Sequence, residues 1–245
     1  MTNVLTGRKP VLEALRAGRA LDKVLVLRGT HGSTIDEIRR LAEQRGITVQ
    51  DSEKQHFREF SPEALTQGVI AFAPEKKAAE LEDILTAIRE RGETGFLLIL
   101  DQIEDPQNLG ALIRTAECAG VHGAIIPRHH AAPINPTVVK ASAGATEHLP
   151  IAEVTNLVNA IEELKQAGFW VIGLAGDGDK TYAQVDYTVP IAFVVGNEGR
   201  GIRRLVKEHC DHLVRIPLFG KVESLNASVA GALGMFEVVR QRERR

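Results

Sequence analysis

Asparagine, arginine, glutamate and serine side chains that could take part in catalysis occur in three short segments, each behind an apolar run. In the first segment, Asn108 and Arg114 follow the run FLLIL at 96–100. We expect Asn108 to be the N-cap of a helix. Because helical side chains lean toward the helix start and Gly110 leaves space there, Arg114 could reach back to where an anion would bind. An exposed arginine on an ordinary helix is the alternative interpretation of this segment alone.

The second segment, GNEGRG at 196–201, places Glu198 among three glycines directly after the apolar run at 191–195. Glycine permits close backbone approach, so we expect this loop to contact a ligand, with a plain tight turn as the alternative. Its spacing, G-x-x-G-x-G, differs from the G-x-G-x-x-G of dinucleotide-binding proteins. The difference argues against a nicotinamide-dependent oxidoreductase.

The third segment, residues 215–239, combines an irregular loop with a helix rich in small side chains. Pro217 and Gly220 mark the loop, and Ser224 and Asn226 flank the predicted helix start. The alanines and glycines that follow allow very close packing, and packing in the core would explain them. It does not explain a Ser-x-Asn pair at the helix entrance, so these two side chains are candidates for a site.

The elements that position these segments alternate regularly between strand and helix from residue 95 onward. Unbroken apolar runs are typical of strands covered on both faces. We expect strands at 96–100, 123–126, 169–174, 191–195 and 212–216, and helices at 108–119, 155–167, 201–209 and 225–240. This order predicts an α/β fold with a parallel sheet and helices on both faces. Ligands bind beyond the carboxyl ends of such strands, which is where all three segments fall.

The first 72 residues have shorter elements that predict a small α/β unit. In order, we expect a helix around Pro10, a strand at 22–29, a helix capped by Ser33 and ended by Gly46, a strand at 47–49, a short helix opened by Ser61-Pro62, and a strand at 68–73. The polar stretch PEKKAAE follows at 74–80. The shift in composition predicts a domain at 1–73, a linker at 74–94 and a second domain at 95–245.

Composition and charge restrict the class of protein. Hydrophobic residues make up 44% of the 245-residue chain and charged residues 25%, as in an ordinary globular protein, and the net charge is −2. A broad RNA-binding surface would be more basic. An RNA substrate would therefore be held by local clusters: Arg8 and Lys9, Arg39 and Arg40, Arg200 with Arg203 and Arg204, and Arg240, Arg242, Arg244 and Arg245.

The sequence contains no indication of a membrane span, an export signal or a metal site. No apolar run approaches the roughly 20 residues that span a bilayer, and the start MTNVLTGRKPVLEAL lacks the pattern of a signal peptide. Cys118 and Cys210 are far apart, and we expect two reduced thiols. Neither they nor His129-His130 have metal-ligand spacing. We therefore expect a cytoplasmic protein without a metal.

Taken together, three motifs resemble the SpoU family of RNA ribose 2′-O-methyltransferases. They are N-x₅-R from Asn108 to Arg114, GNEGRG at 196–201, and P-x-x-G…S-L-N-A-S-x-A at 217–230. Residues 1–72 also resemble the small L30e-like RNA-binding domain of one branch, which includes bacterial enzymes that methylate a guanosine ribose in 23S ribosomal RNA. The resemblance implies S-adenosylmethionine as cofactor, a carboxyl-terminal segment threaded into a deep trefoil knot, and a homodimer formed through the knotted domain.

The resemblance also assigns roles to residues. The catalytic polar residues would be Asn108, Arg114, Glu198, Ser224 and Asn226. The cofactor would lie against Gly196, Ile216, Ser224, Leu225 and Asn226, held largely by backbone groups. RNA would contact Arg8, Lys9, Arg114 and Arg200. Arg114 is often proposed to activate the 2′-hydroxyl, but a guanidinium keeps its proton and is a poor base, so clamping an RNA phosphate is easier.

Two alternative functions remain open. A tRNA 2′-O-methyltransferase of the same family would share the motifs, although the separate amino-terminal domain argues against it. A non-catalytic RNA-binding ribosome-assembly factor could keep the fold, but the intact polar motif residues disfavour it.

The predicted helix at 225–240 favours a dimer. It carries Leu233, Met235, Phe236 and Val239 beside its small residues, which is more apolar surface than one buried face needs. In the dimers of the family, Arg114 of one chain would lie near the cofactor of the other.

Overall fold

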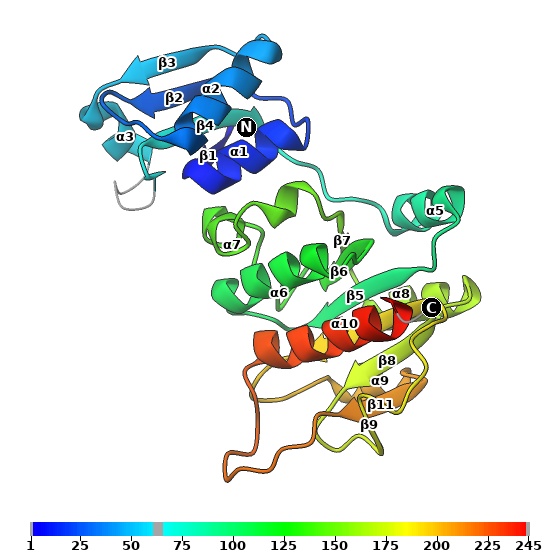
Figure 1. Ribbon diagram of the computed structural model, residues 1–245. Helices are drawn as coiled ribbons and strands as arrows, with labels where there is room; N and C mark the ends of the chain where they lie inside the picture. The colour runs from blue at the N-terminus through cyan, green and yellow to red at the C-terminus, as the bar shows by residue number, and fades with distance from the viewer. Residues whose placement is uncertain (1, 61–65, 244–245) are drawn as a thin grey trace. The chain divides into compact units, whose positions relative to one another are not determined.

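The computed structural model describes residues 2–60 and 66–243, which form two compact units (Figure 1). The first unit comprises the chain up to Lys77 together with Ile134–His148, and the second comprises Ala78–Pro133 and the chain from Leu149 onward. The short helix expected at Ser61-Pro62 and the basic residues Arg244 and Arg245 lie outside the described residues.

A four-stranded sheet in the order β1-β4-β2-β3 forms the first unit. Strand β4 is antiparallel to β1 and β2, and β3 is parallel to β2. The elements are β1 (Thr2–Thr6), α1 (Arg8–Arg16), β2 (Lys23–Leu27), α2 (Ser33–Gln44), β3 (Val49–Ser52), α3 (Lys54–Phe60) and β4 (Val69–Pro74). The sequence pattern does not predict β1, because its five residues, TNVLT, include only two large apolar side chains.

The start of α2 differs from the prediction. Gly32, with φ of 124°, occupies the N-cap position, and Ser33 is the first helical residue, so the assignment of Ser33 as the cap is wrong. Glycine is favoured there because the backbone turns through a positive φ. Gly46, with φ of 65°, follows the end of α2 as predicted.

A segment from the second half of the chain, Ile134–His148, belongs to the first unit. It contains α7 (Pro136–Ala141) and the 3₁₀ turn η1 (Ala145–Glu147). Val139 packs against the apolar core of the unit, and the buried carboxylate of Glu147 pairs with Arg19 at 2.7 Å. The predicted boundaries, 1–73, 74–94 and 95–245, differ from this division because contacts between distant parts of the chain cannot be read from local composition.

The second unit contains a seven-stranded sheet in the order β7-β6-β5-β10-β8-β11-β9, with every pair of neighbours parallel, as predicted. Its strands are β5 (Phe96–Asp101), β6 (Gly123–Pro127), β7 (Ile151–Val154), β8 (Trp170–Leu174), β9 (Lys180–Thr181), β10 (Ile191–Gly196) and β11 (His212–Arg215). Its helices are α5 (Leu81–Arg91), α6 (Pro106–Cys118), α8 (Leu157–Gln166), α9 (Arg204–Glu208) and α10 (Ala227–Glu243).

The central strand β10 is buried on both faces, and its side chains alternate between two layers of helices. Ala192 and Val194 pack in the cluster that contains α5, α8 and α9. The opposite face meets α10, whose glycines lie against Phe193 and Val195. Helix α5 is thus part of the second unit, because its apolar side chains are buried there, although the sequence predicts residues 74–94 as a linker.

Small residues bring α10 very close to its neighbours. A Cβ atom added at Gly231 would lie 2.5 Å from Leu112 of α6, and one added at Gly234 would lie 2.2 Å from the ring of Phe193. Two glycines of α10 therefore serve packing within the chain, which was the simpler interpretation of this helix. The knot that the resemblance implies stays a prediction.

Candidate active site

The GNEGRG loop folds tightly upon itself at the carboxyl end of β10. The backbone groups of Asn197 and Gly201 exchange two hydrogen bonds of 3.1 and 2.8 Å. A Cβ atom at Gly196 would lie 2.3 Å from the carbonyl carbon of Gly201. At Gly196, glycine is required by this close approach of the chain to itself, and its predicted contact with a ligand stays a prediction.

A buried carboxylate binds the chain two residues after this loop. Asp101, at the end of β5, is 0% exposed, and its oxygens accept hydrogen bonds from the backbone N–H and the Nε of Arg203, both at 2.7 Å. A buried ionised group needs such partners to offset its loss of hydration. Asp101 was not predicted as a site residue, although it is the first polar residue after the run at 96–100.

Helix α6 is capped by Asp105 and not by Asn108, so that prediction is wrong. The Asp105 carboxylate accepts hydrogen bonds from the backbone N–H groups of Gln107 and Asn108, both at 3.2 Å, and Pro106 is the first helical residue. Proline suits that position because its missing N–H has no partner there in any case. The side chain of Asn108, 9% exposed, is left to point at another segment.

Asn108, Glu198 and Asn226, one from each motif, form a hydrogen-bonded group that we call the Asn–Glu–Asn cluster. Glu198 Oε1 accepts from Asn108 Nδ2 at 2.8 Å and from Asn226 Nδ2, and it also accepts from the backbone N–H of Ala227 at 3.2 Å. Asn226 Nδ2 donates to Asn108 Oδ1 at 3.0 Å. The three segments therefore meet at one point, as the sequence predicts for carboxyl ends of parallel strands.

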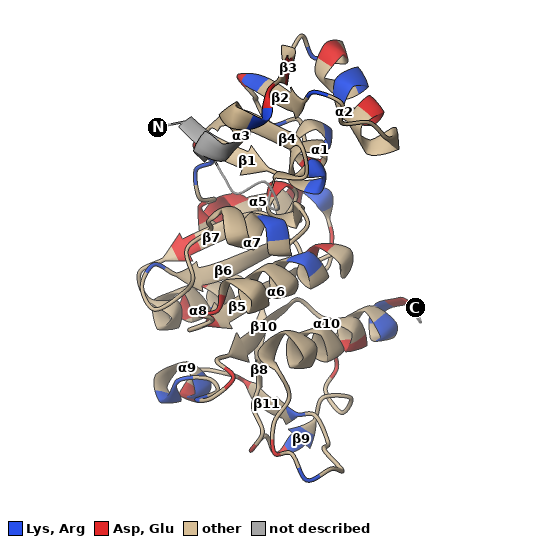
Figure 2. Cartoon of the chain, turned by 90° about the vertical axis from the view of Figure 1, so that its left-hand side faces the viewer, with Lys and Arg blue, Asp and Glu red and all other residues tan. Residues whose placement is uncertain are grey.

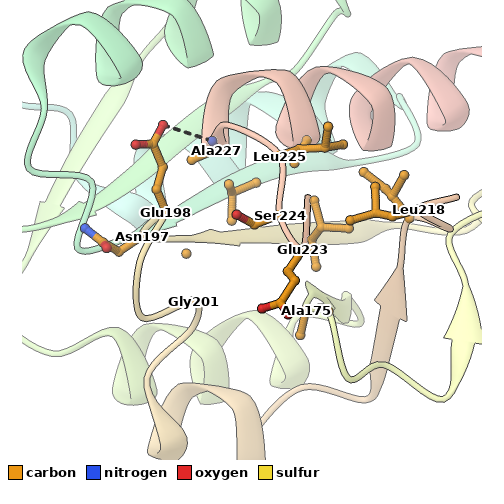
Figure 3. Close-up of a pocket in the computed structure, with 15 residues that line it drawn as sticks. Ala175, Asn197, Glu198, Gly201, Leu218, Glu223, Ser224, Leu225 and Ala227 are labelled. Carbon is orange, nitrogen blue, oxygen red and sulfur yellow. Dashed lines mark hydrogen bonds between the residues drawn. The ribbon is translucent and has the colours of Figure 1, made fainter. Parts of the chain in front are cut away.

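A pocket with an empty volume of about 650 Å³ lies beside this cluster at the carboxyl ends of β8 and β10 (Figure 3). It is lined by Leu174, Ala175, Gly176, Val195, Gly196, Asn197, Glu198, Gly201, Ile216, Leu218, Glu223, Ser224, Leu225, Ala227 and Ala230. Of the residues predicted to hold a cofactor, Gly196, Ile216, Ser224 and Leu225 line the pocket, whereas Asn226 does not. Asn197, Glu223 and the β8 end were not predicted.

Arg114 lies away from this cluster in its own chain. It is exposed and makes no hydrogen bond or ion pair with any residue in 2–60 or 66–243. The six residues from Asn108 to Arg114 correspond to a rotation of about 240° and a rise of about 9 Å along α6. Arg200, in the GNEGRG loop, is also exposed.

The basic residues predicted for RNA in the first unit lie at the start of α1. Lys9 is exposed, and Arg8 Nε donates to the carbonyl oxygen of Gln67 at 3.1 Å. Figure 2 shows that basic and acidic residues alternate along α2 and along α9. Arg39 pairs with Asp51 and Arg204 with Glu208, so part of the predicted basic clusters is neutralised within the chain. Contact of these clusters with RNA stays a prediction.

The described residues show no disulfide, no metal site and no membrane-spanning helix. Cys118 and Cys210 are free thiols, and neither lines the pocket. Within residues 2–60 and 66–243, no group of three or more His, Cys, Asp or Glu side chains could hold a metal ion. The helices of those same residues include none that is both long and apolar enough to cross a membrane.

Comparisons with known proteins match both units. Residues 95–236 match the model of the SpoU rRNA Methylase family, and residues 4–79 match a model described as RNA 2′-O ribose methyltransferase substrate binding. A Bacillus subtilis protein described as putative TrmH family tRNA/rRNA methyltransferase YacO is 42% identical over 236 residues, which cover 96% of this chain and 94% of that protein.

Solved structures resemble the chain over its whole length. The SpoU methyltransferase AviRb from Streptomyces viridochromogenes, in complex with AdoMet, has a TM-score of 0.82 and 26% identity and covers 100% of this chain and 92% of its own. An AdoMet-bound rRNA methyltransferase from Sinorhizobium meliloti has a TM-score of 0.78 and 26% identity, with coverage of 98% and 87%.

Proposed function

Because this chain belongs to the SpoU rRNA methylase family and is an RNA 2′-O-ribose methyltransferase, we propose that it methylates a guanosine ribose in 23S ribosomal RNA. The observation that carries the catalytic part of the proposal is the Asn–Glu–Asn cluster, since it joins polar residues of three family motifs beside one pocket. The matched substrate-binding unit supports the choice of a large structured RNA.

The residues of the pocket fit S-adenosylmethionine, which both similar solved structures contain. The apolar side chains of Leu174, Val195 and Ile216 suit an adenine ring, and the two carboxylates in the lining suit a cation. When bound, the cofactor supplies a methyl group on a positively charged sulfur.

Methyl transfer by in-line displacement depends chiefly on alignment, so the residues of the site have mainly positioning roles. The Asn–Glu–Asn cluster fixes the position of the start of α10 relative to the start of α6. Ser224 lines the pocket and makes no hydrogen bond within the described chain, which leaves its hydroxyl for a ligand. Arg114 would clamp an RNA phosphate and stabilise the forming alkoxide, because a guanidinium is a poor base.

The chain is proposed to act as a homodimer, with Arg114 completing the site of the partner subunit. Val229, Leu233 and Phe236 form an apolar stripe along α10 and are 48%, 40% and 49% exposed. Such a stripe on a soluble protein is typical of an interface. Sedimentation should give a mass near twice 26.7 kDa.

Mixing two inactive variants tests the shared site. Arg114→Ala and Asn226→Ala chains should restore part of the activity when mixed, because one hybrid site has both original residues. A monomeric active enzyme would refute the dimer. A dimer that exchanges subunits without any rescue would place Arg114 in the site of its own chain.

Mapping ribose methylation by mass spectrometry in cells that lack the gene tests the substrate. We expect the loss of one 2′-O-methylguanosine from 23S ribosomal RNA, and its return when purified enzyme and S-adenosylmethionine are added to that RNA. Loss from a tRNA would instead favour a tRNA methyltransferase, and no loss from any RNA would favour a non-catalytic assembly factor. Since ribosomal RNA is the proposed substrate, we also propose a cytoplasmic location.

A further inference from the structure

We propose that the carboxylate of Glu223 binds the positively charged methionine end of the methyl donor. This inference rests on the proposed function of the pocket and adds a residue to it. The ligand chemistry is a cation, because S-adenosylmethionine carries two positive groups, its sulfonium and its α-ammonium, against one negative α-carboxylate.

The lining of the pocket is negative. Of its fifteen residues, only Glu198 and Glu223 are ionisable, and none is Lys, Arg or His. Both carboxylates are exposed, so water screens part of their charge, but like charges that line one hollow still add to its negative potential. Such a pocket favours a cationic ligand over a neutral or anionic one.

The two carboxylates are not equivalent. Glu198 is engaged in the Asn–Glu–Asn cluster and accepts the N–H of Ala227. The side chain of Glu223 makes no hydrogen bond or ion pair with residues 2–60 or 66–243. Figure 3 shows its carboxylate directed away from Glu198 and toward Ala175, on the β8 side of the pocket. Glu223 is therefore the carboxylate that remains to neutralise a ligand.

The position of Glu223 suits this role. It directly precedes Ser224 in the S-L-N element, so the loop that carries the pocket-lining serine also carries the carboxylate. Lys221, the nearest cation along the chain, is exposed and does not line the pocket. The adenine and ribose of the donor are uncharged and can be held by apolar and backbone groups, whereas its cationic end gains from a counter-charge.

Isothermal titration of a Glu223→Gln variant with three ligands tests the proposal. S-adenosylmethionine has both cations, S-adenosylhomocysteine has only the ammonium, and 5′-methylthioadenosine has neither. We expect the variant to bind S-adenosylmethionine about three- to tenfold more weakly and 5′-methylthioadenosine as well as the original chain does. A similar loss for S-adenosylhomocysteine would assign the contact to the ammonium, and no loss would assign it to the sulfonium.

Glu104→Gln is the matched control. Glu104 is exposed, does not line the pocket, and its substitution makes the same change in charge. The Glu104→Gln variant should bind all three ligands with the same affinity as the original chain. Added salt should weaken S-adenosylmethionine binding more in the original chain than in Glu223→Gln.

Two results would overturn the proposal while leaving the proposed function intact. One is unchanged affinity of Glu223→Gln for S-adenosylmethionine. The other is an equal loss for 5′-methylthioadenosine, which would show that Glu223 shapes the pocket without contacting charge. If the original chain binds none of the three ligands, the proposed function itself fails, and this inference with it.

Discussion

Asn226 performs two functions that substitutions at this one position can separate. Its Oδ1 accepts hydrogen bonds from the backbone N–H groups of Ser228 and Val229 at 2.9 and 3.3 Å, which caps α10. Its Nδ2 donates to Asn108 at 3.0 Å and to Glu198. A serine side chain can accept the capping hydrogen bonds of α10 but cannot replace the two hydrogen bonds that Nδ2 donates. Aspartate can also replace the cap, but it places a second negative charge beside Glu198.

The expected losses of stability follow from these contacts. Removing a helix cap costs about 1 kcal/mol. Removing the two side-chain donors costs about 1–2 kcal/mol more, because water can reach this partly exposed group and replace part of the interaction. We therefore expect Asn226→Ala to lose about 2–3 kcal/mol and Asn226→Ser about 1–2 kcal/mol. Asn226→Asp adds a repulsion of about 1–4 kcal/mol for charges about 4 Å apart.

The free energy of unfolding in urea, followed by circular dichroism, measures these differences. At neutral pH the order of stability should be the original chain, then serine, alanine and aspartate. Near pH 4 the aspartate variant should approach the serine variant, because protonation of one carboxyl group removes the repulsion. Asn156 caps α8 through Val158 N–H and has no such cluster, so Asn156→Ser should be nearly neutral. A serine variant at 226 as stable as the original chain would refute a stabilising role for the cluster.

Three further predictions concern packing, thiol chemistry and the division into units. Gly234→Ala adds a carbon 2.2 Å from a phenylalanine ring of β10, so it should destabilise by about 1–3 kcal/mol in urea, although alanine favours helices; an unchanged midpoint would contradict this. Burial raises the pKa of the Cys210 thiol to about 12, so a thiol reagent at pH 8 should modify the exposed Cys118 and reach Cys210 only after denaturation. The thiol ionises at a lower pH in the unfolded chain than in the folded chain. The free energy of unfolding should therefore stay constant below the unfolded pKa and fall as the pH rises above it. In a fragment of residues 78–245, amides of 134–148 should exchange hydrogen much faster than in the full chain, since their packing partners are missing; equal rates would argue against the division.

Most of the second unit could be predicted from the sequence because its strands are unbroken apolar runs. The five predicted strands agree with the observed ones to within one residue at each end. Strands β7 and β9 were missed because IAEV and KT are too short and too polar to show a pattern. In the first unit, helix starts with glycine at the N-cap could not be distinguished from starts capped by serine.

The candidate site was predicted in part, because the motifs include its three clustered polar residues but not the hydrogen bonds between them. Motif spacing indicated Asn108, Glu198 and Asn226, and the structure joins them. Motif spacing could not show that Asp105 caps α6 and leaves the side chain of Asn108 free to bind elsewhere. Nor could it pair Asp101 with Arg203, because a contact across about a hundred residues depends on the tertiary fold.

The inclusion of Ile134–His148 in the first unit has a consequence for synthesis of the chain on the ribosome. Residues up to Lys77 emerge first, yet their partner segment is added only after the first strands of the other unit. At about 5–20 residues per second, that interval is roughly 4–14 seconds. During this time Arg19 lacks Glu147, and the core lacks Val139. We expect the nascent amino-terminal unit to be incomplete and exposed to chaperones until the second unit is partly translated, so the two units cannot mature strictly one after the other.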